Sequence, residues 1–191
     1  PSAVPTTSIP SATPSLTGTV VVISLSSEVE EELSSTEIDR LRDIVIDSYG
    51  LDPEEDPIST TVDYSTSGTM TMEGIIGSEL SPEELETLED SMENTLSEIL
   101  GVPSENIDLI IDPETGVVTY TISSPTFNET QTILDQLKTD PISFVDEFTT
   151  ALVEDLAEQN IISSEIVENI SITSVDADDQ IVADVTVVID E

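Results

Sequence analysis

The sequence predicts an α+β fold with antiparallel sheets and helices on one face. Two apolar patterns alternate along the 191 residues: short stretches of period two, typical of strands, and longer stretches of period three to four, typical of helices. Most strand patterns come in pairs separated by a short turn, which favours antiparallel pairing. Aromatic residues make up only 3% and Trp is absent, so the core must consist mainly of Ile, Val and Leu.

The first 17 residues stand apart from these patterns. They combine Pro with Ser and Thr and contain no charged side chain. This composition cannot bury a core and is typical of O-glycosylated stalks; a plain disordered tail is the alternative. We expect residues 1–17 to form an extended stalk or linker. The candidate O-glycosylation sites in it are Ser2, Thr6, Thr7, Ser8, Ser11, Thr13 and Ser15.

A strand and a helix follow the stalk. TVVVISL (19–25) has apolar residues on both faces, which predicts a central strand. Ser34 and Glu37 then have the spacing of a capping box, and apolar residues recur at helical intervals. Gly50 ends this helix in the prediction, because glycine adopts the left-handed conformation of a helix C-cap.

The next two stretches predict a hairpin. TTVDYS (60–65) and TMTMEGII (69–76) both alternate, and Ser67-Gly68 between them is a common turn dipeptide. The helix pattern after them begins with a second capping box at Ser81 and Glu84 and stops at Gly101.

The remainder of the chain predicts four strands and two helices. Strands over 106–112 and 117–123 are joined by the turn PETG. Helices are predicted over 128–138 and 141–159. The patterns of EIVENISITS (165–174) and QIVADVTVVID (180–190) predict the last two strands.

The predicted order is β-α-β-β-α-β followed by β-α-α-β-β. The first part has the order of a ferredoxin-like unit, and the second begins another unit but lacks its last helix and strand. We therefore expect two tandem modules, over residues 18–113 and 114–191. Helix-hairpin segments at 36–76, 82–123 and 141–190 read as weak internal repeats.

This division also predicts how copies would associate. A ferredoxin-like sheet has the strand order 4-1-3-2, so an incomplete second module leaves an open edge beside 117–123. We expect a neighbouring copy to fill it by strand addition, in a contact that does not close and so forms a filament. Residues 1–16 would lie across the partner. Alternatively, strands 106–112 and 117–123 join both modules into one sheet without a gap.

The net charge limits the possible partners. Forty-two acidic and three basic residues give a formal net charge of −39. Phosphate binding needs clustered Lys and Arg, so nucleic acid and anionic membranes are excluded. The longest apolar run, VVVI at 20–23, is far shorter than the ~20 residues of a membrane span, so we expect no membrane insertion.

Recognisable catalytic chemistry is missing from the sequence. Without His or Cys, the Ser-His-Asp and Cys-His machineries and the common zinc sites are excluded. Neither a GxxxxGK[ST] loop nor a GxGxxG fingerprint occurs. With 42 acids, a carboxylate pair of the glycosidase type has no diagnostic value. We therefore expect a protein that is not an enzyme and has no cofactor.

Two acidic clusters are candidate calcium ligands, because Ca²⁺ prefers carboxylate and carbonyl oxygens. Neither matches the EF-hand loop, and Asp and Pro are also ordinary turn residues. We expect weak, diffuse calcium binding over the surface and no dedicated cage. The candidate ligands are Asp52, Asp56, Asp176, Asp178 and Asp179.

Two triplets are N-glycosylation sequons, at Asn128 and Asn169. Asn128 also has the spacing of a helix N-cap, with Gln131 completing a box, and a glycan on the amide nitrogen leaves the capping oxygen free. Asn169 falls on the outward side of the strand predicted over 165–174. We expect a glycan on at least one of them.

GTVVV (18–22) is similar to the GSVVV of SEA modules, which are ferredoxin-like extracellular domains beside mucin stalks. Thr19 replaces the serine of the self-cleaving members, and the motif begins the first strand instead of the third, so autoproteolysis is not carried over. A longer stretch, 67–123, resembles the tandem strand-helix-hairpin repeats, spaced by Ser/Thr/Pro linkers, of secreted cell-surface or matrix proteins of algae and protists. This resemblance implies an extracellular protein.

Three functions fit these expectations. The first is an extracellular structural glycoprotein whose copies assemble into a filament or surface coat, with other copies and glycans as its partners. The second is a monomeric adhesion or ligand-binding module carried on a stalk. The third is a secreted acidic protein that binds cations or mineral.

Overall fold

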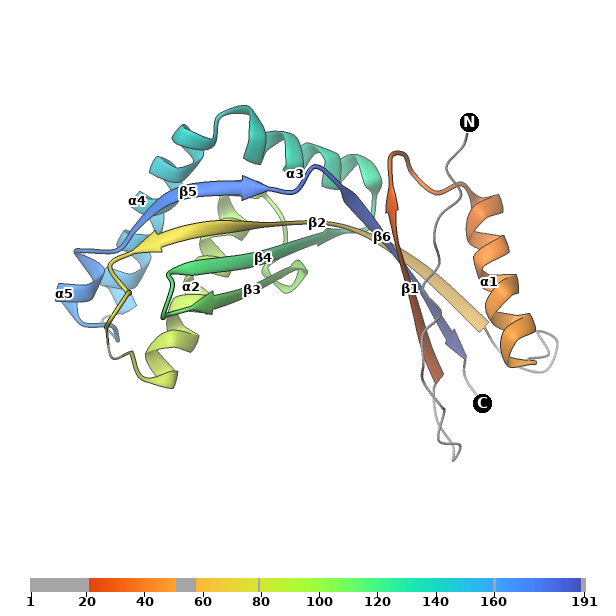
Figure 1. Cartoon of the computed structure of the whole chain (residues 1–191), viewed down its shortest axis with the longest axis horizontal. Helices are drawn as coiled ribbons and strands as arrows, with labels where there is room; N and C mark the ends of the chain where they lie inside the picture. The colour runs from red at the N-terminus through yellow and green to blue at the C-terminus, as the bar shows by residue number, and fades with distance from the viewer. Residues whose placement is uncertain (1–20, 51–57, 79, 160, 190–191) are drawn as a thin grey trace.

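The structure is a computed structural model that describes residues 21–50, 58–78, 80–159 and 161–189 (Figure 1). It confirms the α+β prediction: one six-stranded antiparallel sheet lies beside several helices. The strands are β1 (Val21–Val29), β2 (Ile58–Glu73), β3 (Ile107–Asp112), β4 (Val117–Ser124), β5 (Ser171–Ala177) and β6 (Ile181–Ile189). The helices are α1 (Ser35–Tyr49), α2 (Pro82–Leu100), α3 (Phe127–Thr139), α4 (Pro141–Gln159) and the single turn α5 (Ser164–Val167).

Strand β2 is the central strand of the sheet and pairs with three other strands. The order is β1-β6-β2-β4-β3, and β5 pairs with the second half of β2. On one edge of β2, β6 pairs with residues 58–65 and β5 with residues 68–73. On the other edge, β4 pairs with residues 64–71. One sixteen-residue strand therefore connects the two ends of the molecule.

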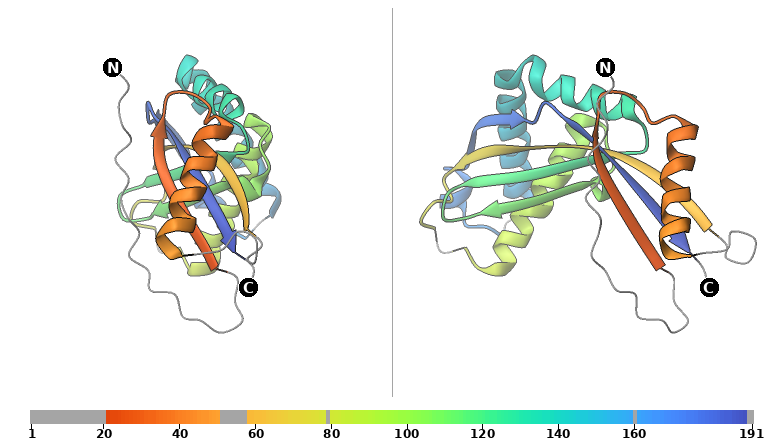
Figure 2. Two further views of the ribbon diagram at one scale, coloured as in Figure 1. Left: turned by 90° about the vertical axis from the view of Figure 1, so that its right-hand side faces the viewer. Right: turned by 45° about the vertical axis from the view of Figure 1, so that its right-hand side comes forward.

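Two groups of elements pack around β2, and we call them lobes. The small lobe consists of β1, α1, β6 and residues 58–65 of β2, and α1 covers it (Figure 2). The large lobe consists of residues 66–73 of β2 with β3, β4, β5 and the helices α2 to α5. In both lobes the helices cover the same face of the sheet, because the buried residues of β6 alternate without a break from Ile181 to Ile189.

The two lobes have cores of unequal size. The small core contains four buried side chains, Ile23, Val45, Val187 and Ile189. The large core contains most of the remaining buried residues. It is built from β2 to β5 with α2, α3 and α4, and Ile181 and Ala183 of β6 also belong to it. The scarcity of aromatic residues leads to an aliphatic core in which Met70, Met72 and Met92 are fully buried.

The local signals for helices α1 and α2 are confirmed. Ser34 and Glu37 form a capping box, and so do Ser81 and Glu84. In both helices the C-cap is a glycine in the left-handed conformation. These capping signals involve only residues close together in the sequence, so they predict the helix ends whatever the arrangement of the rest of the chain.

The hairpin predicted over 60–76 is wrong. Residues 58–73 form the single strand β2, and Gly68 lies in its middle, opposite Tyr120 of β4 and Ala177 of β5. Glycine also occurs within strands where another group approaches the backbone closely. The aromatic ring of Tyr120 makes such an approach at Gly68.

The open edge predicted beside 117–123 is also wrong. Strand β4 pairs with β2 on one side and with β3 on the other, so it is an inner strand. The boundary predicted between residues 113 and 114 falls in the turn that joins β3 to β4. The strands assigned to two successive modules thus belong to one sheet, as in the alternative arrangement.

The strand predicted over 165–174 is only partly correct. Its first residues form the helical turn α5, and the strand β5 begins at Ser171. Ile166 and Ile170 would share a strand face, but the backbone N–H of Ile170 donates to the carbonyl of Ile166 at 3.0 Å, which is a helical contact. Spacings of four residues fit both periods, so this short apolar segment was ambiguous.

Candidate functional site

The face of the sheet opposite the helices is rich in hydroxyl groups. On the large lobe, Thr69 of β2 lies between Thr119 of β4 and Asp176 of β5. In the next row, Thr121 of β4 lies between Ser67 and Asp108. These side chains are exposed or half-buried, and no helix of the described ranges covers them. The face is therefore polar, flat and open to solvent or to a partner.

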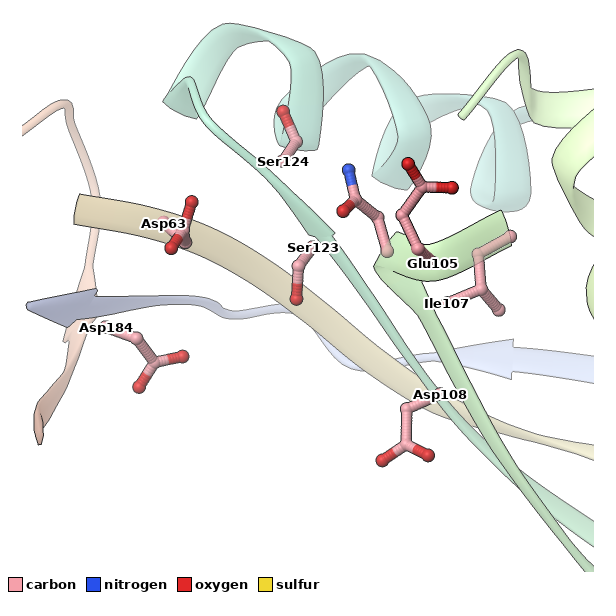
Figure 3. A pocket seen from close by; sticks show the side chains of 8 residues that line it. Asp63, Glu105, Ile107, Asp108, Ser123, Ser124 and Asp184 are labelled. Carbon is pink, nitrogen blue, oxygen red and sulfur yellow. The ribbon is translucent and has the colours of Figure 1, made fainter. Parts of the chain in front are cut away.

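An acidic hollow interrupts this face where the two lobes diverge (Figure 3). It has a volume of about 310 Å³ and lies between the small-lobe part of β2 and β6 and the ends of β3 and β4. Four carboxylates line it, from Asp63, Glu105, Asp108 and Asp184. The other lining residues are Asn106, Ile107, Ser123 and Ser124.

Two of these carboxylates face each other directly. Asp63 of β2 and Asp184 of β6 are partners in the strand register. Like charges directly opposite on neighbouring strands repel. The hydroxyl of Ser26 on β1 donates to the carboxylate of Asp184, which partly compensates. Arg and Lys are both missing from the lining of the hollow.

The four carboxylates give the hollow a negative potential that favours cations. In the described ranges, no group of three or more acidic side chains is arranged so that it could hold a metal ion. The four carboxylates of the hollow come from separate strands and a turn, and they are spread around its rim (Figure 3). The arrangement suits hydrated counterions held by charge alone.

Among the predicted calcium ligands that the structure describes, Asp176, Asp178 and Asp179 form no group that could hold a metal ion. Asp52 and Asp56 lie outside the described residues. Asp178 instead closes the end of β5: its backbone N–H donates to the carbonyl of Ser67 at 2.8 Å, and its carboxylate accepts from the Ser67 hydroxyl at 2.7 Å. Asp179 forms an ion pair with Lys138, and the hydrogen bond from Lys138 lowers the pKa of its carboxyl.

The Asn128 sequon lies in the first turn of α3, with its asparagine exposed. The prediction that Asn128 is the N-cap is wrong. Thr126 takes that position, and its side chain accepts from the backbone N–H of Glu129 at 3.3 Å. The third sequon residue, Thr130, is buried and its hydroxyl donates to the carbonyl of Tyr64 at 3.1 Å.

The Asn169 sequon spans the link from α5 to β5: Asn169 precedes the strand, and Ser171 is the first residue of β5. Its asparagine is exposed, and the side-chain amide donates to the carbonyl of Glu165 at 2.6 Å. An N-linked glycan leaves one N–H on this nitrogen, so that hydrogen bond can persist after modification. The O-glycosylation candidates in the first 17 residues lie outside the described part of the chain.

Strand β1 is the edge of the small lobe. It pairs with β6 over its full length, from Val21 to Val29, and has no second partner among the described strands. In an antiparallel pair, every second residue of an edge strand points its N–H and C=O groups outward. Val22 on the open face of this strand is 58% exposed. β1 therefore presents both free backbone groups and apolar surface.

Neither the acidic hollow nor the β1 edge was predicted from the sequence. The hollow depends on the register that brings β2 and β6 together across 121 residues of chain, from Asp63 to Asp184. The β1 edge depends on the same pairing, because β6 lies between β1 and β2. The double-sided apolar pattern of 19–25 predicted a central strand, whereas β1 lies at the edge of the sheet formed by the described strands.

No known protein family, curated protein or solved structure matches the chain. Among the described residues, none of the helices combines the length and the hydrophobicity that crossing a bilayer requires.

Proposed function

We propose that the protein is an extracellular structural glycoprotein whose copies assemble into a filament or a surface coat. The observation that carries this proposal is the edge of β1, which has no second partner among the described strands. A nine-residue edge strand with exposed apolar residues is a template for pairing with another chain.

The order of the strands supports a modular interpretation of this edge. The segment β2-α2-β3-β4-α3-α4-β5 has the strand order β5-β2-β4-β3, which corresponds to the order 4-1-3-2 of a complete ferredoxin-like unit. The small lobe has the order β1-β6-β2, which corresponds to 1-3-2 of a second unit. We interpret the chain as two interlocked modules that share β2. The unfilled fourth place would lie beside β1, in the unit that begins first.

The shared strand suits a structural role. The sixteen residues of β2 extend over roughly 50 Å at about 3.3 Å per residue. Both lobes are hydrogen-bonded to it, β6 and β5 on one edge and β4 on the other. A pulling force on one lobe would pass to the other through the backbone of β2 and not through a flexible linker.

Secretion and glycosylation are supported by the sequence and by exposure. Both sequon asparagines, Asn128 and Asn169, are exposed in the folded chain. The Pro/Ser/Thr-rich residues 1–17 have the composition of a glycosylated stalk. The net charge of −39 suits an environment where salt or divalent cations screen the surface. These features fit an extracellular location.

Electron microscopy of the native material tests the proposal. We expect ordered filaments or sheets built from this chain. A native protein that occurs only as single particles would favour the monomeric adhesion module. Calorimetric titration with calcium tests the remaining alternative, an acidic cation-binding protein, because that function requires saturable binding.

A further inference from the structure

Three of the described strands, β1, β3 and β5, lie at edges of the sheet. In β3 and in β5, a backbone N–H donates a hydrogen bond to a side chain of a helix. On β3, the backbone N–H of Ile111 donates to the carboxylate of Glu89 on α2 at 3.2 Å. On β5, the backbone N–H of Ile172 donates to the hydroxyl of Thr149 on α4 at 3.1 Å. Within the described ranges, no side chain from another element bonds to the backbone of β1. β1 is thus the edge that is open to a new strand.

Charge favours β1 over β3 and over the first half of β2. β5 has as few acids as β1, but the N–H of its Ile172 is already bonded to Thr149. A second copy of this chain also has a net charge of −39, so copies repel wherever acids face each other. The six residues of β3 include two Asp, and β5 includes Asp176. The first half of β2 also has an unpaired edge, but it leads to Asp63 at the acidic hollow. The nine residues of β1 contain a single acid, Glu28, near one end.

We propose that β1 pairs antiparallel with the β1 of a second copy, around a two-fold axis at Leu25, the middle residue of the strand. This inference rests on the proposed function and names the contact through which assembly begins. An isologous contact of this kind needs only one self-complementary surface and closes at a dimer, so a filament or coat grows from these dimers through a second, different contact. It would join the two six-stranded sheets into one continuous sheet.

The two-fold register matches the side chains of β1. Leu25 faces its own copy, and Val21 faces Val29 on the same side of the sheet, next to the small core. On the other side, Ser24 faces Ser26. Val22 faces Glu28, so each of the two carboxylates lies opposite an apolar side chain and not opposite its counterpart. The strand also lacks Lys, Arg and Pro, the residues that commonly protect natural edges.

Residues 1–17 are a poorer occupant of the edge than a second β1. They contain Pro5, Pro10 and Pro14, and each proline removes one backbone donor from a ladder. Strand β1 has a donor at every position.

Single-cysteine variants test the register, because the chain has no cysteine of its own. In the proposed pair, the two Cα atoms at position 25 are about 4.5–5.5 Å apart, within disulfide range. The Leu25→Cys variant should therefore form a disulfide-linked dimer under mild oxidation in ~1 M NaCl, where the screening length is ~3 Å. In Val29→Cys the two thiols would be roughly 27 Å apart at about 3.4 Å per residue, so this matched control should stay unlinked.

A third variant measures how much disulfide linkage arises from random collisions between molecules. Ile110→Cys places a thiol at a position that is 63% exposed on β3, and it should also stay unlinked. Sedimentation velocity of the unaltered chain in the same buffer should show a dimer or larger species. This measurement needs no variant, so it does not depend on how the variants fold. A Leu25→Cys variant that links no faster than Val29→Cys and Ile110→Cys overturns the inference.

The results also separate this inference from the proposed function. If the native material is filamentous but Leu25→Cys does not link, the function stands and the β1 contact is wrong. If Leu25→Cys links and the native material contains only dimers, the β1 contact stands and the filament is wrong.

Discussion

Gly68 of β2 lies directly under the phenol ring of Tyr120 on β4. The two residues are partners in the strand register, and a Cβ atom at position 68 would overlap the Tyr120 hydroxyl and the carbonyl oxygen of Asp176. The Tyr120 hydroxyl donates to that same carbonyl at 3.4 Å. The glycine therefore admits a buried aromatic ring into the middle of the longest strand.

Replacing this glycine should destabilise the fold. We expect Gly68→Ala to lower the free energy of unfolding by about 1–3 kcal/mol, the usual cost of overpacking. Thr69→Ala, at the exposed neighbouring position, is the control and should cost less than ~1 kcal/mol. Urea unfolding followed by circular dichroism measures both. An equal decrease in the free energy of unfolding of both variants would show that the close approach at Gly68 does not affect stability.

The same residue pair shows where sequence reasoning failed. Ser67-Gly68 has turn chemistry, and the flanking stretches alternate as hairpin strands do, so a local pattern cannot distinguish a turn from a strand in which glycine makes room for a neighbour. The decisive contact comes from Tyr120, more than 50 residues away. The starts of α1 and α2 were predicted correctly because Ser34 and Ser81 are each three residues from their capping partners.

The candidate sites follow the same rule. The sequons of Asn128 and Asn169 can be found from the sequence alone, and both asparagines are exposed in the structure. The acidic hollow and the free edge of β1 were not predictable, because both arise when β6 inserts between β1 and β2. An alternating strand such as 181–189 can pair with any other strand of matching length, so its apolar pattern leaves the partner undetermined.

Tyr120 should make the protein sensitive to alkaline pH. Burial, with the charges of Asp178 and Asp176 adding to it, raises the pKa of Tyr120 well above its ordinary value near 10. A raised pKa means that folding favours the protonated phenol. The buried phenol of Tyr120 contributes fully to the free energy of unfolding at pH values below the pKa of Tyr in the unfolded chain. This contribution is lost as the pH rises above about 10.

The Tyr120→Phe variant isolates this effect. Between pH ~10 and ~12, the free energy of unfolding of the unaltered protein should fall more steeply than that of the variant. Tyr64, whose pKa is also raised by burial, is present in both proteins and therefore cancels. Urea midpoints measured across this pH range give the comparison. Parallel pH profiles would mean that Tyr120 ionises as easily in the folded chain as in the unfolded one.

The facing carboxylates of Asp63 and Asp184 should cost stability at low salt. We expect Asp63→Asn to raise the free energy of unfolding by about 0.2–1 kcal/mol in ~10 mM NaCl, and the gain should shrink in ~1 M NaCl. Glu147→Gln removes one charge at an exposed position of α4 and controls for net charge. If both variants gain equally, only net charge matters and the strand register contributes nothing.

Salt should stabilise the whole chain, because screening weakens the repulsion among 42 acidic residues. The thermal unfolding midpoint is expected to rise from low to high NaCl and with added Ca²⁺. Differential scanning calorimetry under the three conditions provides the test. Identical midpoints in all of them would contradict the expectation.

Glycans should add to the mass of the native protein. The bare chain has a mass of 20.5 kDa, and we expect a larger intact mass with sugars on Asn128 or Asn169 and in residues 1–17. Loss of one glycan mass in Asn128→Gln or Asn169→Gln, expressed in a glycosylating host, assigns the site. A native mass equal to the bare chain would remove the argument for secretion.

Hydrogen–deuterium exchange of the assembled protein tests the central claim, assembly through the β1 edge, most directly. Half of the β1 backbone amides point away from β6, and they should exchange fast in dilute, low-salt protein and slowly in the assembled state. Amides of β3, the opposite edge, should exchange at the same rate in both states. Slowed exchange over 21–29, with unchanged exchange over 107–112, is the predicted result. An assembled protein whose β1 amides exchange as fast as those of the dilute monomer would contradict the account.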